Sequence, residues 1–199
     1  VIRSINDSEN NNFINKYNFK NKYIFYPAKF YSHKNHLYIL EAINLLKKKY
    51  NIIIDLTLIG SESSYTEINF GIDKIIKNKA IELGIENQIN FIGFVPSNEI
   101  PYFYKNSIAL VMPSFTGPNN IPPLEAFSYN CPVCYSDLPE FKEQLGNTAF
   151  YMDLNDPNSL VNILQKILKR DKEVLEKIKL GNNFLKKWDD KIFLSKIIS

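Results

Sequence analysis

Two lysines, Lys29 and Lys34, lie five residues apart in the stretch that follows a short apolar segment at residues 23–26. The apolar spacing after them predicts a helix from residue 35, and the free N–H groups and dipole of a helix start favour an anion. A phosphate-sized ligand fits such an arrangement. Two solvated lysines with no ligand are the alternative, and the spacing alone does not exclude them.

A second stretch with donor groups at a turn covers residues 113–127. Gly117 and the prolines around it favour the turn. Asn119, Asn120 and the N–H groups that follow them can donate to a second anionic group before the next helix. Glu125 follows about one turn inside that helix. Its carboxylate is suited to accept hydrogen bonds from a ribose diol, with a simple partner of the helix dipole as the alternative.

The cysteines Cys131 and Cys134 have the Cys-x-x-Cys spacing of redox and zinc sites. A redox pair normally opens a helix, whose dipole lowers the thiol pKa, whereas this pair leads into a predicted strand. A zinc site needs two more ligands, and His33 and His36 lie far away in the sequence. We therefore favour buried structural thiols over both alternatives.

The carboxylates Asp137 and Glu140 have the spacing of a capping box, with Asp137 as the cap, and we favour this over an acid and base pair. The sequence contains neither a Gly-x-Gly-x-x-Gly loop nor a Walker loop, which argues against dinucleotide and P-loop enzymes. No arrangement of Ser, His and Asp for nucleophilic catalysis stands out either.

The composition indicates a globular protein, since 45% of the residues are hydrophobic and 23% are charged. The net charge is +3 and the lysines are spread along predicted helix faces, so nucleic acid binding is not indicated. No apolar run approaches the roughly 18 residues that span a bilayer, and residues 1–12 lack the order of a signal peptide. We expect a soluble, cytoplasmic chain.

Alternating strands and helices position these loops, which predicts an α/β fold with a Rossmann-like, doubly wound parallel sheet of about six strands and helices on both faces. Ligands of such sheets lie beyond the carboxyl ends of the strands. The strands are predicted at residues 23–26, 52–59, 89–92, 108–112, 132–135 and 149–152. Helices are predicted at residues 35–50, 65–83, 97–106 with Ser97 as its cap, 122–129, 158–169 with Asp156 as its cap, and 188–198.

The ends of the chain differ from this pattern. Residues 1–20 are polar and rich in Asn, and we interpret them as a connection from a missing N-terminal domain. Residues 21–199 are then one nucleotide-sugar-binding domain, in which residues 185–199 form a closing helix that packs on the missing domain. The chain is therefore expected to be a fragment.

Taken together, the loops resemble the C-terminal, donor-binding domain of family 4 retaining glycosyltransferases (glycosyl transferases group 1), which have the two-domain GT-B fold. The resemblance covers residues 23–199 and implies that Lys29 and Lys34 reach the donor diphosphate. It also implies that the backbone at Phe94 and Val95 lies along the nucleotide base. It is carried by these two lysines, by Ile-Asn-Phe-Ile-Gly-Phe-Val at 89–95, and by Pro-Ser at 113–114, Pro-Pro-Leu-Glu-Ala at 122–126 and Cys-Pro-Val at 131–133.

The same resemblance gives Glu125 the role of the second Glu in the family's motif of two Glu separated by seven residues, which holds the ribose hydroxyls. The first Glu of the motif, which contacts the transferred sugar in many members, falls at Gly117. Asn119 and Asn120 are the nearest polar groups for that role, and Ile121 completes the donor site. The Gly-Pro-x-Asn version of this loop is similar to that of a polysaccharide-assembly branch.

The implied function is transfer of a sugar from a UDP- or GDP-sugar to an acceptor hydroxyl with retention, in polysaccharide or lipopolysaccharide assembly. No metal or other cofactor is expected, because lysines and a helix start can stabilise the leaving group. The acceptor, a glycan or lipid-linked glycan, is expected to bind mostly to the missing domain. The full-length protein is then expected at the inner face of the membrane, and the isolated chain to bind the donor without turnover.

A non-catalytic nucleotide-sugar-binding or scaffold subunit of the same fold is the alternative, motivated by Gly117. Product formation by the full-length protein with a pooled acceptor extract would exclude it. A nucleotide-sugar epimerase of similar architecture is a third hypothesis, and it needs further acid and base residues that the sequence does not offer.

Overall fold

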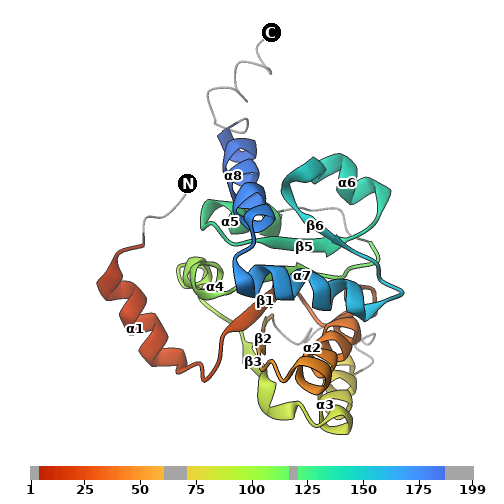
Figure 1. Cartoon of the computed structure of the whole chain (residues 1–199). Coiled ribbons are helices and arrows are strands. Elements are labelled where there is room, and N and C mark those ends of the chain that lie inside the picture. Colours follow the sequence, from red (N-terminus) through yellow and green to blue (C-terminus); the bar gives the residue numbers. More distant parts are fainter. Residues whose placement is uncertain (1–4, 61–70, 117–120, 187–199) are drawn as a thin grey trace.

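The computed structural model describes residues 5–60, 71–116 and 121–186, and these contain a six-stranded sheet in which every neighbouring pair is parallel (Figure 1). The strand order is β3-β2-β1-β4-β5-β6, which confirms the predicted doubly wound sheet. The strands are β1 (Tyr23–Pro27), β2 (Asp55–Ile59), β3 (Ile89–Gly93), β4 (Ala109–Met112), β5 (Val133–Ser136) and β6 (Phe150–Met152).

Helices cover both faces of this sheet (Figure 1). One layer holds α2 (His36–Tyr50), α3 (Ile72–Leu83) and α7 (Pro157–Lys169). The other holds α4 (Ile100–Asn106) and α5 (Ile121–Ser128), with α8 (Lys172–Lys186) against α5. The remaining helices are α1 (Asp7–Tyr17), α6 (Pro139–Leu145) and the 3-10 turns Ser32–Lys34, Glu86–Gln88 and Gly146–Thr148. Among the described helices, none is both long and apolar enough to cross a membrane.

The strands are buried because both faces of the sheet are covered. All four residues of β4 and all five of β2 are buried, as expected for the continuous apolar runs of a parallel sheet. Helix α7 shows the complementary pattern, since Leu160, Leu164 and Ile167 recur at helical spacing and are buried against the core.

The start of α7 confirms the predicted cap. The Asp156 carboxylate accepts a hydrogen bond from the Asn158 backbone N–H at 2.9 Å, and Pro157 occupies the first helical turn, where its missing N–H costs nothing. The cap satisfies one of the free N–H groups of the helix start. The start of α7 is therefore specified by local sequence, and the Tyr38 hydroxyl of α2 adds hydrogen bonds to the Asp153 and Asp156 carbonyls of the turn before it.

Two other predicted caps are wrong. Helix α4 begins at Ile100 after Glu99, without a side-chain cap, and Ser97 lies in the turn before it. Helix α6 begins at Pro139 after Leu138, also without a side-chain cap, and Asp137 instead pairs with the Lys142 ammonium. Each helix has a proline in its first turn, and proline favours the first helical position.

The N-terminal stretch contains a helix that the sequence analysis did not assign. The Asn6 side chain caps α1 by accepting from the Glu9 N–H at 2.7 Å, and Phe13 is the one buried residue of the helix. The Phe13 ring packs edge-on against Phe103 at 4.8 Å and parallel to Tyr102 at 5.4 Å between centroids. Helix α1 is thus attached to α4 by an aromatic cluster.

Several predicted boundaries differ from the observed ones. The strand expected at 52–59 begins at Asp55, because α2 ends with Asn51 in the left-handed region and the Ile52 N–H then bonds to the Leu46 carbonyl. The helix expected at 65–83 is described from Ile72 onward. The beginning of that prediction and the helix expected at 188–198 lie outside the described residues.

Both cysteines are fully enclosed in the core, as predicted for structural thiols. Cys131 and Cys134 are free and buried, and burial raises the pKa of the Cys131 thiol to about 12. Burial also raises the pKa of Cys134, so neither thiol is activated toward redox chemistry. Within the described residues, no group of three or more His, Cys, Asp or Glu comes together in a metal-binding arrangement.

Candidate functional site

The sheet has its topological switch point between β1 and β4, at its centre. From this point the chain winds outward through β2 and β3 on one side and through β5 and β6 on the other. The loops after β1 and β4 therefore lie next to each other at the carboxyl edge, where ligands of doubly wound sheets bind. These are the two loops that the sequence analysis singled out for Lys29, Lys34 and the stretch before Glu125.

The loop after β1 turns sharply before α2. A 3-10 turn covers Ser32–Lys34, and Asn35 adopts φ 52° so that α2 begins at His36. Asparagine tolerates this left-handed conformation better than most residues. Lys29 is exposed, whereas Lys34 is half-buried, and this burial lowers the pKa of its ammonium group. The loop thus brings one solvated and one partly enclosed cation to the carboxyl edge.

Hydrogen bonds join the loops after β1 and β4. The Phe115 N–H donates to the His33 carbonyl at 2.9 Å. On β1, the Tyr26 hydroxyl donates to the Lys34 carbonyl at 3.0 Å and lies 2.9 Å from the Ser114 hydroxyl oxygen. Tyr26 is fully buried, so both loops rest on one rigid side chain of the sheet. The two loops therefore form a single surface although they are far apart in the sequence. Tyr26 and Ser114, for example, are separated by 88 residues.

A first cavity, of about 240 Å³, opens where β1, β2 and β3 end. Lys29, Phe94 and Val95 line it, and the Phe94 ring is 82% exposed. Gly60, at the end of β2, is needed for this geometry. A Cβ atom there would lie 2.7 Å from the Ala28 carbonyl oxygen, and the φ of +153° at this position disfavours other residues.

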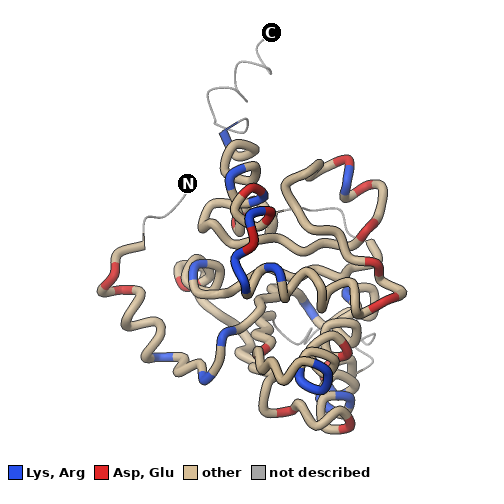
Figure 2. Tube along the Cα trace, in the orientation of Figure 1, with Lys and Arg blue, Asp and Glu red and all other residues tan. Residues whose placement is uncertain are grey.

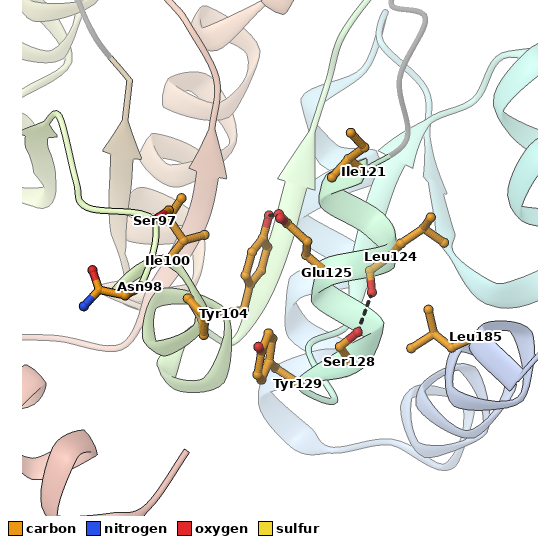
Figure 3. Close-up of a pocket in the computed structure, with 11 residues that line it drawn as sticks. Ser97, Asn98, Ile100, Tyr104, Ile121, Leu124, Glu125, Ser128, Tyr129 and Leu185 are labelled. Carbon is orange, nitrogen blue, oxygen red and sulfur yellow. Dashed lines mark hydrogen bonds between the residues drawn. The ribbon is translucent and has the colours of Figure 1, made fainter. Parts of the chain in front are cut away.

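A second cavity, of about 480 Å³, lies between α4 and α5 and contains Glu125 (Figure 3). Figure 3 shows the Glu125 side chain pointing from α5 toward Tyr104 on α4, with Ile121 near the start of α5. The Tyr104 hydroxyl donates to Glu125 Oε2 at 2.8 Å. Ile100 lines both cavities, so they adjoin each other along the start of α4.

Most of the proposed site residues that lie within the described part of the chain line one of these two cavities. Lys29, Phe94 and Val95 line the first cavity, and Ile121 and Glu125 line the second. Lys34 lines neither cavity, although its loop is bonded to the loop after β4. The other proposed residues, Gly117, Asn119 and Asn120, lie outside the described residues.

Tyr104 is a site residue that sequence reasoning missed. It is 1% exposed, and its ring packs edge-on against Phe25 at 5.0 Å, so from the sequence it looks like any other core aromatic of α4. Its distinguishing feature is the hydrogen bond to a carboxylate 21 residues later in the chain. No local pattern reports such a contact between two helices.

Basic and acidic residues are interspersed over most of the helices (Figure 2). This distribution agrees with the small net charge of +3. The cations of the site are therefore local features of one loop.

A fold of this type, with its site at the switch point, defines a domain that binds a ligand at the carboxyl edge of a Rossmann-like sheet. The family model of "Glycosyl transferases group 1" matches residues 7–183. The chain belongs to this family. The match includes α1, which the sequence analysis interpreted as part of a connection.

Curated relatives are named as an O-antigen chain mannosyltransferase and a glycosyltransferase of capsular polysaccharide biosynthesis. The chain is 28% identical to the O-antigen chain mannosyltransferase RfbU of Salmonella typhimurium over 95% of this chain and 48% of that protein. It is 30% identical to the capsular polysaccharide biosynthesis glycosyltransferase CapH of Staphylococcus aureus over 81% of this chain and 44% of that protein. The chain thus spans about half the length of these relatives.

Solved structures share the fold. A glycosyltransferase from Rickettsia africae superposes with a TM-score of 0.81 at 18% identity, over 98% of this chain and 51% of that one. Anabaena HepE in complex with UDP gives a TM-score of 0.81 at 15% identity, over 98% and 52%. The C-terminal domain of LpcC from Francisella tularensis gives 0.73 at 21% identity, over 94% and 95%. The chain therefore has the fold of the C-terminal half of a GT-B glycosyltransferase.

Proposed function

We propose that this chain is the donor-binding half of a retaining glycosyltransferase that moves a sugar from a nucleoside-diphosphate sugar to an acceptor hydroxyl. The observation that carries the proposal is the junction of the loops after β1 and β4, where the Phe115 N–H bonds to the His33 carbonyl at 2.9 Å. This junction brings the loop of Lys29 and Lys34 beside Ser114 and Phe115, which follow β4. Cations and a helix start on one surface suit a diphosphate.

In the proposed donor complex, Lys29 and Lys34 contact the diphosphate. The base lies along the backbone at Phe94 and Val95, and the position of these residues around the first cavity supports that role. Glu125 accepts hydrogen bonds from the ribose in the adjoining cavity, whose volume of about 480 Å³ is within the range of small-molecule sites.

The proposed sugar subsite is formed by the loop that contains Gly117, Asn119 and Asn120, followed by Ile121 at the start of α5. We propose that the amides of this loop contact the transferred sugar and the phosphate next to it. The support is that the described residues on either side of it contact the site: Phe115 bonds to the loop after β1, and Ile121 lines the second cavity.

The proposed chemistry places the growing negative charge on the leaving diphosphate as the anomeric bond breaks. Lys29, Lys34, the N–H groups at the start of α2 and the Ile121 N–H at the start of α5 are fixed donors that stabilise this charge, without a metal or other cofactor. Removal of one such donor costs about 3 kcal/mol in comparable sites, or roughly a hundredfold in rate. The donor is proposed to be a UDP- or GDP-sugar, and the support is that HepE, which shares this fold, was solved in complex with UDP.

Polysaccharide or lipopolysaccharide assembly is the proposed setting, because the curated relatives are named for O-antigen and capsular polysaccharide synthesis. Since the chain spans about half of those relatives, we propose that a second domain binds the acceptor glycan at the cytoplasmic face of the membrane. Residues 1–20 then connect the domains, residues 21–199 bind the donor and residues 185–199 pack on the second domain. The isolated chain is proposed to bind the donor without turnover.

The test is calorimetric titration of the chain with UDP and with GDP. Lys34→Ala is expected to weaken binding of the preferred nucleotide at least tenfold, because a charge-assisted contact to phosphate is lost. Lys22→Ala is the matched control, since Lys22 precedes the opposite, amino end of β1 and should leave the affinity unchanged. Equal affinities of Lys34→Ala and the unsubstituted chain would reject the phosphate site.

A further inference from the structure

Tyr104 reaches the Glu125 carboxylate from the opposite wall of the second cavity. Its hydroxyl donates to Glu125 Oε2 at 2.8 Å, and both residues line this cavity of about 480 Å³ (Figure 3). Tyr104 comes from α4 and Glu125 from α5, so the bond spans the space between the two helices. Tyr104 lies in α4 and not in the loops at the carboxyl edge, so the proposed function gives it no role in ligand binding.

The tyrosine ring has a fixed position. It is 1% exposed, packs edge-on against Phe25 at 5.0 Å and lies parallel to Tyr129 at 6.3 Å. Its neighbours on α4 anchor the helix on the other side, since Phe103 is fully buried and the Tyr102 hydroxyl bonds to Glu9 Oε2 at 2.7 Å. A side chain held in this way presents its hydroxyl at one place, because no rotamer change is open to it.

The Tyr104 hydroxyl is a permanent donor. Burial raises its pKa well above the usual value, and the charge of Glu125 raises it further, so the phenol stays protonated. Its single proton is directed to Glu125 Oε2. Glu125 Oε1 has no hydrogen-bond partner among the residues that the structure describes. One carboxylate oxygen is thus fixed by the protein while the other keeps its full capacity to accept.

We propose that Tyr104 is a positioning residue that orients the Glu125 carboxylate toward the ribose diol of a bound nucleotide. The inference rests on the proposed function, in which Glu125 contacts the ribose. A glutamate on a helix surface has several rotamers, and ordering it on binding costs affinity. Tyr104 removes that cost in advance, so the pair distinguishes ribonucleoside diphosphates from their 2′-deoxy counterparts.

The experiment measures this discrimination by calorimetric titration of the chain with UDP, GDP, 2′-deoxy-UDP and 2′-deoxy-GDP. The unsubstituted chain is expected to bind the preferred ribonucleotide at least tenfold more tightly than its 2′-deoxy form, since a hydrogen bond to a charged group is lost. Tyr104→Phe is expected to reduce this ratio severalfold while leaving the affinity for the 2′-deoxy nucleotide unchanged. Tyr102→Phe, which removes a hydroxyl of α4 that bonds to Glu9 on α1, should preserve the ratio.

A double-substitution cycle separates positioning from a merely structural role. In the Glu125→Ala background, Tyr104→Phe is expected to change the affinity for the ribonucleotide by less than twofold, because the group through which Tyr104 acts is gone. The ratio between ribo and 2′-deoxy nucleotides is the deciding readout, since a general loosening of the fold weakens both ligands alike.

The outcomes distinguish the inference from the proposed function. If the unsubstituted chain binds neither UDP nor GDP, the proposed function fails. If it binds one of them, the donor site stands. The positioning role of Tyr104 is then overturned if Tyr104→Phe keeps the full preference for the ribonucleotide over its 2′-deoxy form. It is also overturned if Tyr104→Phe weakens binding equally with and without the Glu125 carboxylate.

Discussion

His36, the first residue of α2, is a buried histidine without a partner for either ring nitrogen among the described residues. It is 1% exposed and lies between the rings of Tyr26 and Phe30, at 4.9 and 5.4 Å between centroids. Burial, together with the nearby charges of Lys34 and His33, lowers the pKa of His36 to about 4. The folded chain therefore keeps this imidazole neutral at the proposed phosphate loop.

This pKa predicts a dependence of stability on pH. The unfolded chain binds a proton at His36 with a pKa near 6.5, and the folded chain only near 4, so the unfolded chain holds more protons between these values. Stability is then greatest above pH 6.5 and falls as the pH falls. The contribution of His36 is a loss of about 2 kcal/mol between pH 7 and pH 5 and of about 3 kcal/mol by pH 4.

His36→Phe removes this contribution and keeps an aromatic ring in the site. At pH 7 we expect the free energy of unfolding to change by less than about 1 kcal/mol, because the lost imidazole makes no hydrogen bond within the described residues. Urea unfolding at pH 7, 6, 5 and 4 gives the pH slope of each chain. The carboxylates titrate in both chains, so the difference between the slopes isolates His36.

A matched control is His33→Gln, which removes a half-buried histidine from the same loop and should reduce the slope less. Identical slopes for His36→Phe and the unsubstituted chain would refute the reasoning. That result would mean that His36 has similar proton affinity in the folded and unfolded states.

Two further predictions concern the packing that supports the site. Gly181→Ala in α8 would place a Cβ atom 2.5 Å from the ring of the buried Phe127. Overpacking should outweigh the gain in helix propensity, so we expect the free energy of unfolding, measured with urea, to fall by about 1–2 kcal/mol. A more stable variant would contradict this. Phe13→Ala should cost about 3–5 kcal/mol if α1 is an integral part of the domain, whereas Ile14→Ala, at a neighbouring position that is 42% exposed, should cost less than about 1 kcal/mol. Equal small losses for the last two variants would show that α1 is only a tether.

Local sequence was sufficient for the fold class and the approximate elements because each segment carries its own signal. The apolar runs of β2 and β4 are buried on both faces, and the intervening helices have apolar residues at helical spacing. Asp156 with Pro157 specified a helix start in the same local way. The caps assigned to Ser97 and Asp137 were wrong because a proline inside the first turn of the following helix set the start instead.

Helix α1 escaped prediction for a related reason. Its sequence is polar apart from a few residues, and only Phe13 is buried, so no apolar stripe announces it. Its stability comes from an aromatic cluster with Phe103 and Tyr102, nearly a hundred residues further along the chain. Packing of this kind depends on where the sheet places α4.

For the candidate site, the sequence by itself determined which loops carry the lysines and which helix carries Glu125, because turn residues and helix starts are local properties. Only the tertiary structure decided that the loops after β1 and β4 form one surface, since the bond from Phe115 to His33 requires β1 and β4 to be neighbours in the sheet. It likewise decided that Tyr104 meets Glu125. Contacts between separate crossovers depend on strand order, and no short stretch of sequence contains that information.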